Sequence, residues 1–580
     1  MINFELKLRQ ETRFRWVTCQ LEVLANCSNL SELRKALHSL PTTLEETYDR
    51  ILLSIRRECR SDVVEFLQWL AFSVRPLTLL ELAEVFAIDR DKLRFDPDRR
   101  PRKPCGILNN CSSLVKVSYT DDYDSVRKSG TLGLAHLSVK EYLISEQIRN
   151  SSLSHYHLDE KLANSAISRD CLLYLLQFDT VDCLCNESEA SISFGRYAAE
   201  FWITHARSDD GVIQNSVQKL VTRLLSSSGV HFNNWVTLFD ADYGCRNYFL
   251  KTSHNVPSPL YYASLLGLGK IVHELALSSS ADVNMAEGYD GSALASASAR
   301  GHKEVVQILL ENGADVNAAG GFYGSALASA SANEHKELVQ ILLKNGANVN
   351  MGRGGGSYGS AMELLLAGSE KEIMQILLEK GADVNMAGGH YSSTLALALT
   401  RGREDIMRNL PENGADMNVA GGFYGSALAS ASAGGHKEVV KILLENEADV
   451  NIAGGHFGSA LGSASTKGHK EVVQILLENG ADVDVVGGFY GSALASASTG
   501  GHKEIVQILL ESGADVNMAG GFHGSALGSA SANGHKELVQ ILLKNGANVN
   551  ITGGYHGNAL ESAITRGHEE IVHILHEWSR

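Results

Sequence analysis

Apolar and polar positions in the second half of the chain follow a pattern that repeats about every 33 residues. In residues 325–346, Ser325 precedes the small-residue stretch ALASASA, and the next stretch, KELVQILLK, places Leu338 and Leu342 on one broad face. A serine in this position is a typical helix N-cap, and Gly346 suits the left-handed residue that ends a helix. Each unit is therefore predicted to form a helix, a turn, a second helix and an extended, glycine-rich loop.

The element GSAL, or a close variant, marks the same position in successive units. Its first residues are Gly291, Gly324, Gly359, Ser392, Gly425, Gly458, Gly491, Gly524 and Gly557, and a diverged copy begins near Pro257. A single unit of this size cannot bury its apolar face alone. About ten units are therefore expected to stack into one continuous array over residues 257–580.

The first half of the chain has a different pattern. Residues 1–150 hold longer amphipathic stretches with capping-box patterns that start at Thr43, Thr78 and Ser138, and a β-type run, SSLVKVSY, lies between the last two. Helices followed by a strand, a loop, a second strand and a helix form a winged-helix layout. The predicted fold is thus mainly α: a helical, winged-helix-like module over residues 1–150, a helical connector over residues 151–256, and an α-solenoid over residues 257–580.

The repeats resemble a known family. The 33-residue period and segments such as GHKEVVQILLENGADVN, residues 301–317, are similar to ankyrin repeats throughout residues 257–580. The resemblance implies an ankyrin-repeat solenoid that binds other proteins. One departure is that the family's Thr-Pro-Leu-His start of the first helix appears here as Ser-Ala-Leu-Ala or Ser-Ala-Leu-Gly, which keeps the hydroxyl cap but not the proline or histidine.

A second resemblance covers residues 12–148. The stretches FRWVTCQLEVL, LPTTLEETYDRIL, CSSLVKVSY and LAHLSVKEYLIS are similar to the segment that follows the nucleotide-binding core in fungal NACHT-type signalling ATPases with ankyrin tails. The phosphate-binding loop of that family, G-x-x-x-x-G-K-[ST], does not occur in this sequence, and GLGKI at residues 267–271 lacks both its first glycine and its terminal hydroxyl. We therefore expect the winged-helix and connector region of such a protein without its ATPase core, as a shortened product or as part of a longer protein.

Composition and charge restrict the partners. The 580-residue chain carries a formal charge of −16, and residues 291–580 hold 19 Lys and Arg against 30 Asp and Glu, or −11. An acidic array binds phosphate poorly, so no nucleic acid is expected, and the basic stretch RRPRKP at residues 99–104 is predicted to be a solvated loop. The sequence has no apolar run long enough to span a membrane, and its nine cysteines, all within the first 250 residues, suit reduced thiols. These features predict a cytoplasmic protein, with the nucleus as a further possibility.

No catalytic, cofactor or metal site is expected. Two sets of residues could suggest a metal, but the first has no compact zinc spacing, and the second supplies one histidine per repeat, which forms a row rather than a cluster. The first set is His155, His157, Cys171, Cys183 and Cys185, and the second is His302, His335, His436, His469, His502, His535 and His568.

Aromatic residues recur in the loops, immediately before the glycine of each GSAL element. The candidate residues are Phe322, Tyr323, Tyr358, Tyr391, Phe423, Tyr424, Phe457, Phe489, Tyr490, Phe522 and Tyr555, with His390, His456, His523 and His556 in equivalent positions. A fixed position in every unit predicts a ladder of rings along the loop edge of the solenoid. The ladder could bind a protein partner, or its rings could simply stack on neighbouring loops and stiffen the array; the lack of variation favours stacking.

The expected function is a non-enzymatic scaffold or sensor in intracellular signalling that uses the array to bind an as yet unknown protein. The alternative is a truncated part of a NACHT-type nucleotide-driven switch that associates with a separate or missing ATPase core. A weak joint is also predicted around residues 351–424, because this segment contains the insertion GRGGGS and places Pro411 within a helical stretch.

Overall fold

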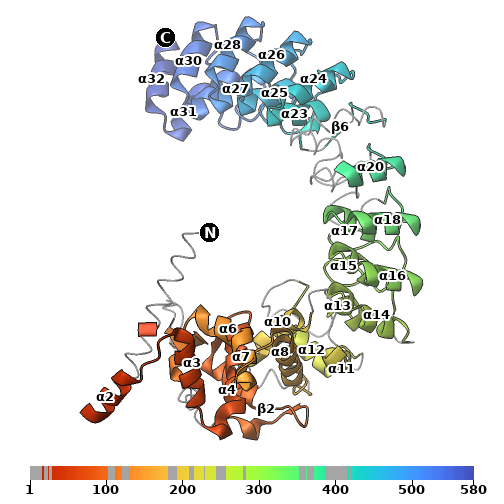
Figure 1. The fold of residues 1–580 in the computed structure, drawn as a ribbon. Helices are drawn as coiled ribbons and strands as arrows, with labels where there is room; N and C mark the ends of the chain where they lie inside the picture. Colours follow the sequence, from red (N-terminus) through yellow and green to blue (C-terminus); the bar gives the residue numbers. More distant parts are fainter. Residues whose placement is uncertain are drawn as a thin grey trace. The chain divides into compact units, whose positions relative to one another are not determined.

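The computed structural model describes residues 29–101, 111–119, 130–179, 193–207, 215–226, 229–242, 256–278, 282–351, 371–385, 414–418 and 423–579, together with a few isolated positions. The chain forms two compact units, Met1–Ile271 and Val272–Arg580, and each is described by itself. The mainly helical character predicted from the sequence is confirmed (Figure 1). The predicted division into three segments stays a prediction.

The first unit begins with a winged-helix arrangement. A three-stranded antiparallel sheet has the order β1-β5-β4, with Leu132 of β5 paired to Leu77 of β1 on one side and to Val117 of β4 on the other. The elements are α2 (Leu30–His38), α3 (Leu44–Leu53), α4 (Arg60–Phe72), β1 (Leu77–Thr78), α5 (Leu79–Phe86), the hairpin of β2 (Ile88–Asp89) and β3 (Arg94–Phe95), β4 (Val115–Tyr119), β5 (Gly130–Leu134), α6 (Leu137–Leu143) and α7 (Glu146–Arg149). The predicted layout of helices, strand, loop, strand and helix is confirmed.

The predicted helix caps of this unit have different outcomes. Thr78 and Glu81 form the complete capping box of α5, as predicted. Thr43 caps α3, but Glu46 accepts hydrogen bonds from Thr42 instead of completing the box.

The prediction of a cap at Ser138 is wrong. Helix α6 begins at Leu137, and Nδ1 of His136 accepts the hydrogen bond from the backbone N–H of Ser138. The hydroxyl of Ser138 is buried instead against the phenol of Tyr48, with the two oxygens 2.8 Å apart. A contact between residues 90 positions apart in the sequence therefore determines the role of this serine.

Four further helices follow in the first unit. They are α8 (Glu160–Leu175), α10 (Ser193–Ala206), α11 (Asn215–Leu224) and α12 (Val230–Leu238). Aromatic side chains fill the core between them: the rings of Trp202 and Trp235 meet edge to face at 6.2 Å, and Tyr174 of α8 packs on Phe194 of α10 at 5.0 Å. These contacts anchor α8, whose other face borders α4.

Pairs of short helices form the repeats. The pairs are α13 (Pro259–Leu265) with α14 (Gly269–Ala276), α15 (Ala293–Ala299) with α16 (Lys303–Glu311), α17 (Ala326–Ala332) with α18 (Lys336–Lys344), α23 (Ala427–Gly434) with α24 (Lys437–Glu445), α25 (Ala460–Lys467) with α26 (Lys470–Glu478), α27 (Ala493–Gly500) with α28 (Lys503–Glu511), α29 (Ala526–Ala532) with α30 (Lys536–Lys544), and α31 (Ala559–Arg566) with α32 (Glu569–Trp578). From α23 to α32, first helices line up in one row and second helices in another (Figure 1).

The local rules of the repeat hold as predicted. Ser325 accepts a hydrogen bond from the backbone N–H of Ala328, and Gly346 follows α18 with a φ of +86°. Every residue of α15 is buried, because alanine and serine let the first helices of adjacent repeats approach closely. The second helices bury only one face, for example Val472, Val473 and Leu476 of α26.

The predicted joint at residues 351–424 is only partly covered. Within it, helix α20 (Lys371–Glu379), residues 414–418 and strand β6 (Ala420–Gly421) are described, and β6 pairs with β7 (Gly425–Ser426) directly after the segment. The glycine-rich insertion and Pro411 lie outside the described residues, so the joint stays a prediction.

Candidate functional site

The loops of the array contain glycines at positions where a larger residue does not fit. In the turn of residues 454–458, the N–H of Gly454 donates to the carbonyl of Gly458, and Gly455 has a φ of +67°. A Cβ atom on Gly455 would lie 2.3 Å from the backbone carbon of Tyr424 in the preceding loop. Neighbouring loops thus touch backbone to backbone, which explains why the glycines of the loop recur.

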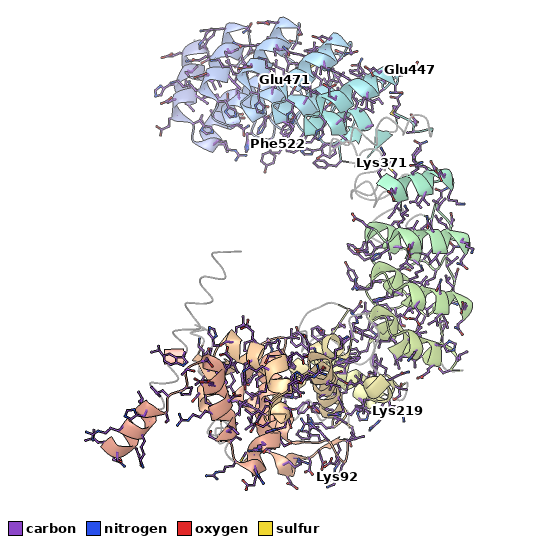
Figure 2. All side chains as sticks on the ribbon, viewed as in Figure 1. Lys92, Lys219, Lys371, Glu447, Glu471 and Phe522 are labelled. Atoms are coloured by element: carbon purple, nitrogen blue, oxygen red, sulfur yellow. The ribbon has the colours of Figure 1, made fainter. Side chains whose placement is uncertain are left out.

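The first aromatic residue of each turn forms a continuous stack of rings in the described C-terminal repeats. Successive ring centroids are 5.0, 5.2, 4.7 and 5.1 Å apart, and successive planes differ by 11–16°. Each N–H also donates to the carbonyl of the preceding member at 2.7 Å. We call these five residues the outer stack: Phe423, His456, Phe489, Phe522 and Tyr555. Figure 2 shows Phe522 at the border of the C-terminal repeats.

The second aromatic residue of each turn forms a looser inner row. The rings of Tyr424, Phe457 and Tyr490 follow one another at 5.9 and 6.2 Å, and those of His523 and His556 at 6.4 Å. Within a turn the two rings are nearly perpendicular, for example 85° in residues 456–457. Phe457 and His523 are only 6% and 7% exposed, so the inner row belongs to the packing between loops.

The ladder of stacked rings predicted from the sequence is therefore present, and the two positions differ in exposure. In the outer stack, Phe423, Phe489 and Tyr555 are 44%, 41% and 77% exposed. Phe322 and Tyr323 are half-buried in the repeat before α17, while Tyr358 and Tyr391 lie outside the described residues. Stacking does not test partner binding, which stays a proposal and concerns the outer stack most directly.

One further ring, which was not predicted from the sequence, belongs to the ladder. Tyr289 stacks on Phe322 at 5.0 Å with an interplanar angle of 18°, and its carbonyl accepts a hydrogen bond from the N–H of Phe322. Tyr289 stands two positions before Gly291, as Phe322 does before Gly324. An aromatic residue two positions before the glycine could have indicated it, but the second position of this turn is an aspartate instead of an aromatic residue.

Acidic residues lie in the loops that lead into the aromatic turns. Asp449, Asp482 and Asp515 are exposed, one in each loop that precedes an aromatic turn, and Glu447 adds a further exposed charge. Lys544 is a basic residue in the last turn of α30, before the loop that leads to Tyr555. The loops of the array therefore carry exposed rings and, seven residues before some of them, exposed carboxylates.

The recurring histidines have a structural role. His469 Nε2 lies 3.1 Å from the carbonyl oxygen of Ala433 in the preceding repeat, and His502 is placed in the same way against Thr466. This hydrogen bond requires the proton on Nε2. In the described part of the chain, no group of three or more His, Cys, Asp or Glu side chains is arranged to hold a metal ion.

A row of asparagines also joins the repeats. Asn451 Nδ2 donates to the carbonyl of Gly480, and its Oδ1 accepts from the N–H of Asp482. The same pair of hydrogen bonds to the next repeat is made by Asn284, Asn317, Asn350, Asn385, Asn418 and Asn517. Asp484 occupies this position once, and only its acceptor bond, to the N–H of Asp515 at 3.0 Å, remains.

The basic stretch at residues 99–104 is neutralised where it is described. Arg99 lies 3.3 Å from Asp89, and Arg100 lies 2.8 Å from Glu84. Both guanidinium groups thus have carboxylate partners within the module, as expected for a solvated loop; residues 102–104 lie outside the described residues. Among the described helices, none is long and apolar enough to cross a membrane.

Comparisons with known proteins agree with this architecture. The ankyrin-repeat family model matches residues 214–320, 260–353, 364–454, 395–487, 429–520 and 494–579, which together cover more than half of the chain. A model described as the winged helix domain of GPI inositol-deacylase matches residues 48–154.

A curated relative is similar over a shorter length. The azaphilone pigments biosynthesis cluster protein L of Monascus ruber is 35% identical over 315 residues, which are 51% of this chain and 64% of that protein. The match thus spans less than two thirds of the relative. Taken with the family models, the stacked helix pairs and their loops show that the chain belongs to the ankyrin-repeat family.

Proposed function

We propose that the chain is a non-enzymatic interaction scaffold whose repeat array binds a protein partner along the outer stack. The observation that supports this proposal is the exposure of large rings in a fixed row: Phe423, Phe489 and Tyr555 are all more than 40% exposed although the loops around them are tightly packed. Rings held in place by stacking lose little conformational entropy on binding, so they are efficient contact residues.

The chemistry of the edge indicates the kind of partner. The rings face one another, so their C–H edges face outward, and such edges favour apolar side chains and the faces of other rings. The exposed carboxylates of Asp449, Asp482 and Asp515 favour basic residues beside them. The expected partner segment is therefore apolar with flanking Lys or Arg.

The signalling role is a finer proposal. The ankyrin family of the array supports binding to proteins, and we extend this role to a sensor in intracellular signalling. The similar protein of Monascus ruber is fungal. In the alternative, the chain works beside a NACHT-type ATPase as part of a nucleotide-driven switch. Co-purification of such an ATPase with the full chain would favour this alternative.

Affinity capture from the native cell extract tests the main proposal. The full chain is compared with a variant carrying Phe423→Ser, Phe489→Ser and Tyr555→Ser, and with the control Ile564→Ser. Ile564 is 57% exposed on α31 and belongs to the same array, but it lies outside the loops. Circular dichroism first establishes that all three proteins are folded.

The proposal predicts that the triple variant loses a protein that the wild type and the control both retain. Each exposed ring that contacts a partner is expected to contribute about 1–2 kcal/mol, so the loss of three should reduce capture by more than tenfold. Equal capture by the folded triple variant would refute binding through the outer stack.

A further inference from the structure

The exposed part of the aromatic ladder is a line one ring wide. In the outer stack, Phe423, Phe489 and Tyr555 are exposed, and the two members between them are half-buried. The inner row beside it is closed to a partner where Phe457 and His523 are buried. A protein that binds the outer stack, as proposed above, therefore meets a narrow row of rings rather than a broad face.

The rings repeat along this row at nearly the distance that separates two turns of an α-helix. The four distances between neighbouring ring centroids are 5.0, 5.2, 4.7 and 5.1 Å, and together they make about 20 Å. An α-helix rises 5.4 Å per turn, so four turns cover about 22 Å. A helix that lies parallel to the row thus stays within about 2 Å of register over all five rings, which is less than half of one ring-to-ring distance.

Extended segments do not match this spacing. Side chains on one face of a β-strand are about 6.7 Å apart, so five of them cover about 27 Å and leave register with the rings by more than one full step. A polyproline II segment presents one side chain per turn of about 9.3 Å, so it meets only every second ring. Among single segments that run along the row, the helix alone places a side chain at each ring.

Charge decides between a different protein and a second copy of this chain. The loops that connect α24 to α25, α26 to α27, α28 to α29 and α30 to α31 contain five acidic residues and no Lys or Arg. The five are Glu447, Asp449, Asp482, Asp484 and Asp515. A second copy would offer the same ring spacing, but it would bring the same carboxylates, and like charges oppose association. Basic side chains beside an apolar stripe complement these loops.

We propose, on the basis of the proposed function, that the partner segment is a basic amphipathic α-helix that lies along the outer stack with its axis parallel to the row. Apolar side chains spaced three or four residues apart contact one ring per turn. Lys or Arg on both sides of this stripe faces the acidic loops. Five contacts require a helix of about 15 residues or more.

Fluorescence anisotropy with the full chain and labelled designed peptides tests the proposal. The first probe is a helical peptide of about 18 residues, built from Leu, Lys and Ala, with one Leu per turn on a single stripe. Its isomer has the same composition with the Leu residues distributed around the helix, a third peptide carries Glu in place of Lys, and a fourth carries a proline at its centre, which breaks the helix. The chain is used as wild type, as the triple variant Phe423→Ser, Phe489→Ser and Tyr555→Ser, and as the control Ile564→Ser, after circular dichroism has shown that all three are folded.

The proposal predicts saturable binding of the stripe peptide with a Kd below about 100 μM. Binding should weaken by about tenfold or more with the isomer, the Glu peptide and the proline peptide, and equally in the triple variant, whereas Ile564→Ser should bind as the wild type does. Equal binding of stripe peptide and isomer, equal binding by the folded triple variant, or no saturable binding up to about 1 mM would overturn the proposal.

Two further outcomes identify other occupants of the row. Undiminished binding of the proline peptide would indicate an extended partner and overturn the helix. Sedimentation of the chain alone that shows self-association in the wild type and not in the triple variant would identify a second copy as the occupant, which also overturns the proposal. Capture of a protein through the outer stack from the cell extract, together with failure of the stripe peptide, would leave the proposed function standing and remove only the helical partner.

Discussion

The contact between neighbouring loops can be measured with two glycines of the same conformation. Gly458 and Gly480 have φ values of +84° and +83°, so alanine at either position suffers the same left-handed backbone strain. A Cβ atom on Gly458 would lie 2.3 Å from the carbonyl oxygen of Gly487 in the next loop, whereas one on Gly480 meets nothing within 4 Å. The difference between Gly458→Ala and Gly480→Ala therefore isolates the packing of one loop on the next.

The expected magnitudes follow from these contacts. Strain alone should lower the free energy of opening by about 1–2 kcal/mol in Gly480→Ala. In Gly458→Ala the loops must also separate, which weakens the hydrogen bond from the N–H of Phe489 to the carbonyl of His456, worth about 1 kcal/mol, and the stacking of the two rings, worth about 0.5–1.5 kcal/mol. The total for Gly458→Ala is about 2.5–4.5 kcal/mol.

Hydrogen exchange in the intact chain gives these free energies locally. Helices α25 and α26 lie between Gly458 and Gly480 in the sequence, and their amides report the opening of this part of the array. Exchange should accelerate much more in Gly458→Ala than in Gly480→Ala. Opening free energies that agree within about 0.5 kcal/mol, the usual scatter of such comparisons, would refute close packing of the loops.

Two further predictions concern buried or bridging polar groups. Asp484→Asn should stabilise the array by about 0.5–1.5 kcal/mol, because the new amide can donate to the carbonyl of Gly513 as the asparagines of other repeats do; unchanged or faster hydrogen exchange in α27 and α28 would contradict this. Glu65 has its pKa raised to about 7 by burial and by the nearby Asp170, so folding binds its proton more tightly than the unfolded chain does. The unfolding free energy of the first unit should therefore fall as pH rises from about 5 to 7.5, by on the order of 1–3 kcal/mol, and Glu65→Gln should remove this fall. Burial lowers the pKa of His205 to about 4, so this residue makes the unfolding free energy rise with pH in the wild type and in Glu65→Gln alike. The difference between the two proteins therefore isolates Glu65. The same pH dependence in both would contradict the raised pKa of Glu65.

Regular features of the sequence predicted the repeats well because their determinants are local. The cap at Ser325 and the helix end at Gly346 depend on residues within a few positions. The same local contacts recur in most described units, although Glu447 takes the glycine position with a φ of +64° and Asn558 caps α31. The aromatic ladder was predictable for the same reason. The sequence did not predict which ring of each turn is exposed, because the left-handed glycines set the direction in which the chain passes Phe457 and its neighbours.

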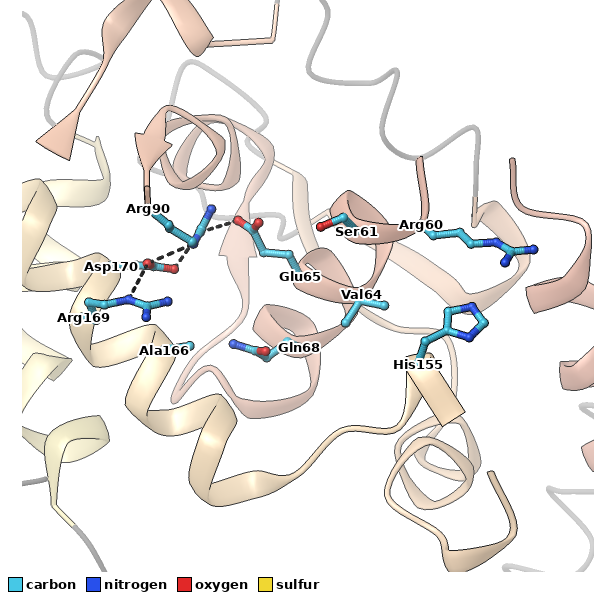
Figure 3. Close-up of a pocket in the computed structure, with 10 residues that line it drawn as sticks. All are labelled: Arg60, Ser61, Val64, Glu65, Gln68, Arg90, His155, Ala166, Arg169 and Asp170. Atoms are coloured by element: carbon cyan, nitrogen blue, oxygen red, sulfur yellow. Dashed lines mark hydrogen bonds and ion pairs between the residues drawn. The ribbon is translucent and has the colours of Figure 1, made fainter. Parts of the chain in front are cut away.

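Long-range contacts escaped the sequence analysis. Ser138 meets Tyr48 across 90 positions, so a local capping pattern predicted the wrong role for it. Arg90 and Asp170 are 80 positions apart and no spacing pattern connects them, so their ion pair became visible only in the folded chain (Figure 3). Sites assembled from separate helices depend on packing that a single sequence does not encode in its periodicity.

Site-specific photocrosslinking tests the central claim most directly. A benzoylphenylalanine introduced in place of Phe489, which is 41% exposed in the middle of the outer stack, is compared in native cells with the same group in place of Ile564 on α31. The account predicts a discrete crosslinked protein from position 489 and none of that size from position 564. A crosslink from position 564 alone, or the same product from both positions, would contradict binding along the outer stack.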